Sequence, residues 1–200
     1  TYHGKKRPYV TLKWAQSADG YIDYHRETNT EETAVRFSTD ETAVHVHRLR
    51  ALSDAILVGR RTAELDNPSL TTRAWPGKDP LRLVIDREGR LDTKLKLFDE
   101  TTKTIVFTDV FRDFKETEGI EQVQIDFDQD IIPQIMAYLY EHKVQRLLVE
   151  GGRVLLQSFI DAGLWDEAFI EEAPFCLGKG VKAPCLEIEY KKEEFESFGH

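Results

Sequence analysis

Leu147-Leu148-Val149-Glu150-Gly151-Gly152 is the stretch of sequence that decides the fold. It completes a predicted buried strand over 145–150 and passes through two glycines directly into a predicted helix over 153–162. Leu155 and Phe159 share one face of that helix. A buried strand that turns through glycine into an amphipathic helix is typical of proteins built around a parallel sheet.

Strands and helices alternate on both sides of this unit. We expect strands over 8–14, 54–58, 81–86, 104–108, 121–125 and 166–171, and helices over 38–52, 60–65 and 130–142. Ser38 and Glu41 have the spacing of a capping box, which predicts a helix start at Ser38. The alternation predicts an α/β protein whose central sheet is mostly parallel and flanked by helices on both faces.

The composition indicates one domain over 8–200, preceded by a linker or arm over 1–7. Hydrophobic residues make up 40% of the chain and charged residues 32%, which excludes a disordered chain. No apolar run approaches the ~18 residues of a membrane helix. The formal net charge is −9 and no basic stripe is present, which argues against nonspecific nucleic-acid binding.

Single residues add expectations about processing and compartment. The chain starts at Thr1 and its only methionine is Met136, so we expect it to be processed or cut from a longer protein. Cys176 and Cys185 are too few for a disulfide framework and are predicted to be free thiols of a cytosolic protein.

Two strand ends are candidate ligand-binding positions. Ligands of open α/β proteins bind at the carboxyl ends of strands, and a helix that starts after glycines offers free amide groups to a phosphate. Gly151-Gly152 fits that description, although a plain tight turn explains it equally well and the G-x-G-x-x-G fingerprint is absent. Lys13 lies near the carboxyl end of the first strand, and is either a site residue or a surface lysine.

Arginines gather around the stretch from Asp66 to Arg73, with Arg50, Arg60 and Arg61 upstream. Arginine suits phosphate because its planar fork donates two hydrogen bonds, but a solvated, ion-paired face is the ordinary alternative. His25-Arg26-Glu27 matches half of a zinc deaminase signature, yet no P-C-x-x-C follows it. The sequence therefore predicts no metal site.

Taken in order, the motifs resemble the reductase domain of the bifunctional deaminase/reductase family of riboflavin biosynthesis. The resemblance runs from about Pro8 to Pro184 and is carried by Pro8–Lys13, Ser17-x-Asp19-Gly20, His47–Gly59, Asp66-Asn67-Pro68-Ser69-Leu70-Thr71-x-Arg73, Val84-Ile85-Asp86, Val149-Glu150-Gly151-Gly152 and Ala173-Pro174. Each motif is modest alone, and their order and spacing together are specific.

The resemblance implies a dihydrofolate-reductase-like three-layer sandwich, usually assembled as a cytoplasmic homodimer. It implies NADPH as the hydride donor and 5-amino-6-(5-phosphoribosylamino)uracil as the substrate, whose ribose is reduced to a ribityl group. In the family a zinc deaminase domain precedes the reductase domain. That domain is absent from this sequence, and we expect the C-terminus to be truncated before the family's last strand.

The resemblance also implies site residues. Lys13 and Glu150 are the candidate catalytic residues, and which of them transfers a proton stays open. The residues expected to bind substrate are Arg50, Leu70, Arg73 and Glu150, with the arginines as phosphate ligands. The residues expected to bind NADPH are Ala15, Thr62, Asp66, Gly152, Arg153, Val154, Leu155, Leu156, Gln157 and Ser158. We add Arg87, which follows the strand over 81–86, as a candidate ligand of the 2′-phosphate.

The sequence departs from the family pattern before the helix over 38–52. Arg36-Phe37-Ser38 stands where the family often has Trp-Ile-Thr, and Ala34 stands near a family serine. Two alternatives therefore accompany the main hypothesis. One is a related reductase that acts on the 2,5-diaminopyrimidinone phosphate intermediate or on a dihydropterin, and the other is a catalytically silent binding or dimerisation domain.

Overall fold

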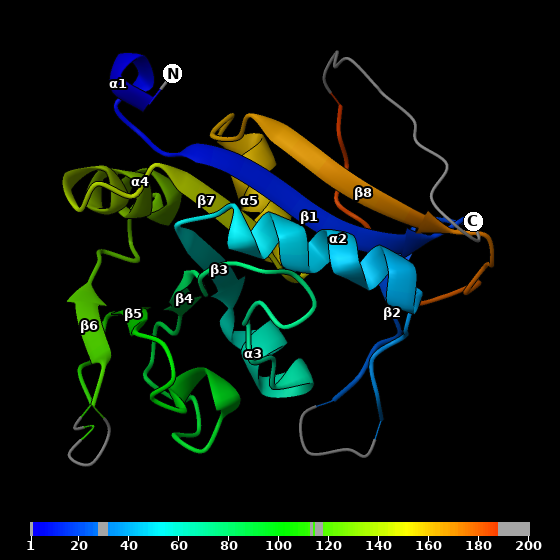
Figure 1. Ribbon diagram of the computed structural model, residues 1–200, viewed down its shortest axis with the longest axis horizontal. Coiled ribbons are helices and arrows are strands. Elements are labelled where there is room, and N and C mark those ends of the chain that lie inside the picture. Colours follow the sequence, from blue (N-terminus) through cyan, green and yellow to red (C-terminus); the bar gives the residue numbers. More distant parts are fainter. Residues whose placement is uncertain (1, 28–31, 113, 115–117, 188–200) are drawn as a thin grey trace.

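A seven-stranded sheet in the order β6-β5-β4-β3-β7-β1-β8 forms the centre of the molecule (Figure 1). The computed structural model describes residues 2–27, 32–112, 114 and 118–187. Every pairing within this sheet is parallel. Its strands are β1 (Tyr9–Ser17), β3 (Ala55–Gly59), β4 (Leu81–Ile85), β5 (Thr104–Thr108), β6 (Ile120–Gln124), β7 (Arg146–Glu150) and β8 (Glu167–Ala173). Two short strands, β2 (Tyr21–Asp23) and β9 (Val181–Lys182), pair antiparallel beside it.

Helices cover both faces of the sheet, as the sequence predicts. The helices are α1 (Tyr2–Lys5), α2 (Asp40–Ala51), α3 (Arg60–Asp66), α4 (Ile131–Glu141) and α5 (Arg153–Asp161), with a 3-10 turn at Lys96–Phe98. Helices α4 and α5 bury apolar side chains in one core cluster, and Leu49 of α2 and Ala63 of α3 belong to a second cluster. Figure 1 shows α2 crossing one face of the sheet and α5 lying behind the other. The three-layer prediction is confirmed.

Strand β1 shows why the two faces differ. Val10, Leu12 and Trp14 point into the cluster under α4 and α5 and are nearly inaccessible to solvent. Thr11 and Lys13 point to the opposite face, because successive side chains of a strand alternate. That second face lies under α2 and carries polar side chains at its carboxyl end. Strand β1 thus packs one face into the apolar core and presents a polar side chain, Lys13, on the other face near its carboxyl end.

The start of α2 corrects the predicted capping box. Thr39 is the N-cap, and its Oγ1 accepts a hydrogen bond from the Thr42 amide at 3.2 Å. Ser38 is not the cap, because its hydroxyl donates to the carboxylate of Glu171 on β8 at 2.5 Å. The error is one residue, and its cause is a tertiary contact that pattern alone does not reveal.

The N-terminal arm is anchored to the sheet. The expected arm over 1–7 contains the short helix α1, and the guanidinium of Arg7 is buried against Asp166. Residues 28–31 and 188–200 lie outside the described residues, and the expected C-terminal truncation falls there with them. Among the described helices, none has the length and apolar character needed to cross a membrane.

Candidate active site

The parallel sheet brings the carboxyl ends of β7, β1 and β8 to one edge. Lys13 of β1 and Glu150 of β7 are register partners, so their side chains lie next to each other on the face under α2. Glu171 of β8 is the register partner of Ala15, one pleat further along the same face. Strand order therefore joins the two predicted catalytic residues, Lys13 and Glu150, in one place.

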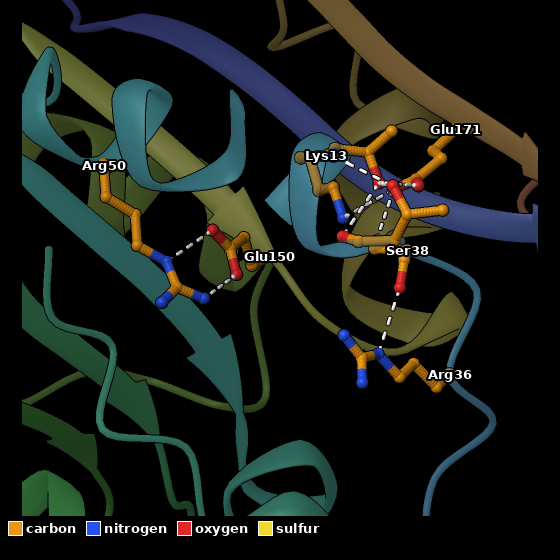
Figure 2. A network of polar contacts seen from close by, with 8 residues as sticks. Lys13, Arg36, Ser38, Arg50, Glu150 and Glu171 are labelled. Atoms are coloured by element: carbon orange, nitrogen blue, oxygen red, sulfur yellow. Dashed lines mark hydrogen bonds and ion pairs between the residues drawn. The ribbon is translucent and has the colours of Figure 1, made fainter. Parts of the chain in front are cut away.

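Helix α2 supplies the counter-ion of Glu150. Arg50 donates from Nε to Oε1 at 3.0 Å and from a terminal nitrogen to Oε2 at 2.7 Å, as Figure 2 shows. Only 12% of the Arg50 side chain and 14% of the Glu150 side chain are exposed. Burial alone raises the pKa of Glu150, but Arg50, with Lys13 adding to it, holds that pKa below its ordinary value. Glu150 is therefore a carboxylate at neutral pH.

The loop after α3 adds a second arginine to this cluster. Leu70 has a left-handed backbone with φ of 55°, and the carbonyl of the next residue, Thr71, accepts from Arg50 at 3.2 Å. The Arg73 amide donates to Nδ1 of His47 at 3.1 Å, and its guanidinium donates to the Thr71 hydroxyl at 3.1 Å. Burial, Arg50 and Arg73 lower the pKa of His47, so its imidazole is neutral. Arg73 itself is exposed and faces solvent.

Lys13 opens onto a pocket of about 390 Å³. Its Nζ lies 3.9 Å from Oε2 of Glu171, and the same carboxylate accepts from the hydroxyls of Ser38 and Thr42 (Figure 2). The pocket is lined by Lys13, Ala15, Ala34, Val35, Arg36, Phe37, Ser38 and Ala43. Two positions at which the sequence departs from the family pattern, Ala34 and Arg36, thus form part of its wall.

The glycine turn before α5 lies against α3. Gly152 is the N-cap of α5 and has no side-chain cap bond, while its own amide donates to Oγ1 of Thr62 at 3.0 Å. Gly151 has φ of 150°, and an added Cβ there would meet the same oxygen at 3.3 Å. The first amides of α5 have no acceptor within the helix. The turn therefore combines free donors with a close backbone approach, as a phosphate site requires.

The other expected cofactor residues divide into two groups. Arg153, Val154, Gln157 and Ser158 line a hollow of about 290 Å³ on the outer side of α5, together with Asp161. Leu155 and Leu156 instead pack in the core, with 7% and 0% of their surfaces exposed. Leu70, expected to contact substrate, is also buried, with 2% of its surface exposed. If these three residues contact a ligand, their backbone groups are better placed to do so than their buried side chains.

Two further expected cofactor residues are engaged elsewhere. The carboxylate of Asp66 accepts from Arg26 at 2.5 Å, and Arg26 also pairs with Asp23 and is only 4% exposed. Arg87 pairs with the exposed Asp128 at 3.3 Å and lies over the Phe127 ring. Asp66 is thus bound to a buried arginine, whereas Arg87 makes an ion pair at the surface.

The sequence did not reveal Glu171 as a site residue. It also did not reveal that Ser38 and Thr42 bind its carboxylate, or that His47 accepts from the Arg73 amide. The hydrophobic periodicity assigned Glu171 to a strand and the other three residues to a helix. That pattern does not predict which strand packs against which helix. In the part of the chain described, no group of three or more metal-binding side chains comes together.

Comparison with known proteins identifies the family of this chain. The family model described as the RibD C-terminal domain matches residues 8–197. The chain is 32% identical to a riboflavin biosynthesis protein RibD of Aquifex aeolicus over 98% of its length and 54% of that protein. It is 31% identical to a 2,5-diamino-6-ribosylamino-4(3H)-pyrimidinone 5′-phosphate reductase of Archaeoglobus fulgidus, over 86% of this chain and 83% of that one.

Solved structures agree with the fold. A deaminase/5-amino-6-(5-phosphoribosylamino)uracil reductase of Thermotoga maritima is 32% identical, with a TM-score of 0.80 over 98% of this chain and 56% of that one. The yeast riboflavin biosynthesis reductase Rib7 has a TM-score of 0.70 at 20% identity over 92% of this chain and 81% of that one, which supports the fold alone. The chain spans about half the length of the RibD relatives it matches. By these comparisons and by its fold, the chain belongs to the RibD C-terminal domain family.

Proposed function

We propose that this protein is an NADPH-dependent reductase of riboflavin biosynthesis that reduces the ribose of 5-amino-6-(5-phosphoribosylamino)uracil to a ribityl group. The observation that carries the proposal is the placement of Lys13 next to an ionised Glu150 on adjacent strands, at the carboxyl edge of the sheet. Arg50 and Arg73 stand beside this pair. The names of the relatives, which include reductases of this pathway, support the reaction class.

The chemistry assigns different roles to the two catalytic candidates. An N-glycosylamine opens to an imine when a proton reaches the ring oxygen, and the opened form carries positive charge. Because Glu150 is held as a carboxylate, it suits stabilisation of that charge better than donation of a proton. Lys13, which lines the pocket, then delivers the proton to the ring oxygen. The proposal therefore makes Lys13 the acid and Glu150 the electrostatic partner.

The two arginines also differ in the proposal. Arg50 donates three hydrogen bonds within the protein, two to Glu150 and one to the Thr71 carbonyl. Among the described residues, the Arg73 side chain bonds to the Thr71 hydroxyl alone, and it is exposed. The guanidinium of Arg73 is thus the freer ligand for the substrate phosphate. Arg50 contributes charge to the same place while it holds Glu150.

The residues around the start of α5 fit a nicotinamide dinucleotide. The free amides after Gly152 suit a pyrophosphate, and the hollow beside Gln157 and Ser158 extends that surface. When bound, the cofactor supplies the hydride. The protein's contribution is to hold the substrate against it, between Lys13 and Glu150, and to limit the access of water.

A second candidate substrate is the 2,5-diaminopyrimidinone form of the same ribosylamino phosphate. It is favoured by the Archaeoglobus fulgidus relative, of whose length this chain covers 83%. The same residues serve both reactions, since the reacting ribose is identical and only the base differs.

The test is NADPH oxidation at 340 nm (the wavelength at which NADPH absorbs) with each substrate in turn. We expect turnover with the aminouracil and a lower kcat/KM with the pyrimidinone. Lys13→Met and Glu150→Gln should each reduce kcat by at least about a hundredfold, in the range of lost acid catalysis or charge stabilisation. Turnover of the pyrimidinone alone would transfer the proposal to the second candidate. Absence of turnover with both substrates would refute it.

We also infer a cytoplasmic homodimer that forms the reductase part of a bifunctional protein with a deaminase domain. The Thermotoga maritima protein, whose name joins both activities, supports the fusion. Sedimentation equilibrium of the chain measures the dimer directly. A monomer at concentrations far above those in the cell would contradict it.

A further inference from the structure

The carboxylate of Glu171 lies inside the candidate active site, although the proposed reaction gives it no task. Its Oε2 accepts a hydrogen bond from Ser38 at 2.5 Å, and its Oε1 accepts one from Thr42 at 2.7 Å. Only 16% of its side chain is exposed. Two hydroxyls from the start of α2 therefore fix this carboxylate of β8 in one orientation.

The charges around Lys13 divide into two pairs. Glu150 is engaged by two hydrogen bonds from Arg50, which leaves Glu171 as the carboxylate that pairs with Lys13. The 3.9 Å between Nζ of Lys13 and Oε2 of Glu171 is an ion-pair distance and too long for a hydrogen bond. The ammonium therefore has its protons available for a ligand in the pocket. Arg36, on the pocket wall, is the other charged residue there.

We propose that Glu171 is a positioning residue that holds the Lys13 ammonium over the pocket. Ser38 and Thr42 hold Glu171 for this task, and so couple the start of α2 to the site. The catalytic consequence rests on the proposed function, in which Lys13 donates the proton. The placement of Lys13 by Glu171 does not depend on that function.

A chemical experiment without substrate tests the placement. Acetic anhydride is small enough to reach a partly buried amine and reacts with neutral amines only. Glu171→Gln keeps an acceptor for one of the two hydroxyls and removes the negative charge, so the Lys13 amine is no longer held beside β8 and becomes easier for the reagent to reach. We expect Lys13 acetylation, followed by mass spectrometry of its peptide, to be about three- to tenfold faster than in the unchanged protein. Thr42→Val should give a smaller increase in the same direction.

Glu172→Gln is the matched control. Glu172 is the next residue of β8, is exposed, and lies on the opposite face of the sheet from Glu171. This variant should leave Lys13 acetylation at the rate of the unchanged protein. Equal rates in Glu171→Gln, in a variant shown by thermal unfolding to be folded, would overturn the proposal and leave Glu171 as a structural tie between β8 and α2.

Kinetics separate this inference from the proposed function. In Glu171→Gln we expect kcat to fall about tenfold while KM for the substrate changes less than about threefold, because a misplaced acid affects the chemical step. An unchanged kcat would overturn the catalytic part of the inference. If the unchanged protein reduces neither substrate but the acetylation effect is present, the proposed function fails and the placement of Lys13 stands.

Discussion

At the scale of single residues, Arg50 is first of all the buried counter-ion of Glu150. Removal of one partner from a buried ion pair leaves the other charge uncompensated and typically costs about 3–5 kcal/mol. Because both side chains are mostly buried, we expect Arg50→Ala to lower the free energy of unfolding by about 3 kcal/mol. Urea unfolding followed by circular dichroism measures this. Arg73→Ala, at an exposed residue of the same cluster, is the control and should change stability by less than about 0.5 kcal/mol.

In the proposed function, Arg73 contributes little to stability and strongly to substrate binding. A charge-assisted hydrogen bond contributes about 1.5–3 kcal/mol, so Arg73→Ala should weaken substrate binding by roughly tenfold to a hundredfold. Arg73→Lys should recover part of this, because an ammonium lacks the two-pronged geometry. Steady-state kinetics and a separate NADPH titration distinguish the ligands, and NADPH affinity should be unaffected. Wild-type catalytic efficiency in Arg73→Ala would show that the substrate phosphate binds elsewhere.

At the scale of elements, the turn between β7 and α5 depends on the backbone of Gly151. At φ of 150° a side chain is strained, and the Cβ would press on Oγ1 of Thr62. We expect Gly151→Ala to cost about 1–3 kcal/mol and to weaken NADPH binding at least severalfold. Calorimetry with NADPH measures both effects. Gly163→Ala, just beyond the other end of α5 and with open space around it, should leave NADPH affinity unchanged.

The start of β8 is tied to the N-terminal segment through Asp166. Its carboxylate accepts from Lys5, Arg7 and the Val10 amide. Burial alone raises the pKa of Asp166, but these contacts, with Arg7 the strongest of them, lower it from 3.8 to about 2. A carboxyl group with a lowered pKa in the folded state stabilises the protein above its unfolded pKa. That stabilisation is lost as the pH falls from about 4 through about 2.

Asp166→Asn tests this link. We expect it to cost about 1–2 kcal/mol at neutral pH, a figure reduced for the solvent exposure of Lys5, and the difference from the unchanged protein to shrink below about pH 4. Urea unfolding at neutral and acidic pH gives the comparison. Asp128→Asn, at a side chain that is 87% exposed, is the control. A difference that is constant with pH would contradict the assignment to the Asp166 charge.

At the scale of the whole molecule, an acidic protein is proposed to bind two anionic ligands. A net charge of −9 repels NADPH and a phosphorylated substrate over most of the surface, so affinity depends on the carboxyl edge of the sheet. A ligand at a hundred times its Kd stabilises the folded state by about 2.7 kcal/mol, or roughly 5–10 °C in Tm for a domain of this size. We expect this shift with NADPH and a smaller one with NADH at the same concentration. Equal shifts would contradict the choice of NADPH.

The sequence by itself determined the local structure and the family. The period of the apolar residues set the strands and helices, and their alternation predicted the parallel sheet and its helical layers. The motifs around Lys13, Arg50, Arg73 and Glu150 indicated the family, which the comparisons confirm. The expected roles of these residues remain predictions. Leu156 shows the limit of transfer by motif, because a run of consecutive helical residues includes side chains that face the core.

Only the tertiary structure decided which residues meet. Lys13 and Glu150 are adjacent because β1 lies next to β7, and strand order is set by packing between distant segments, which local pattern does not encode. The path of α2 across the sheet brings Ser38 to Glu171 and Arg50 to Glu150, and this moved the helix cap from Ser38 to Thr39. Short-range propensity fixes where elements begin within a residue or two. Long-range contacts choose the hydrogen-bond partners and thereby build the site.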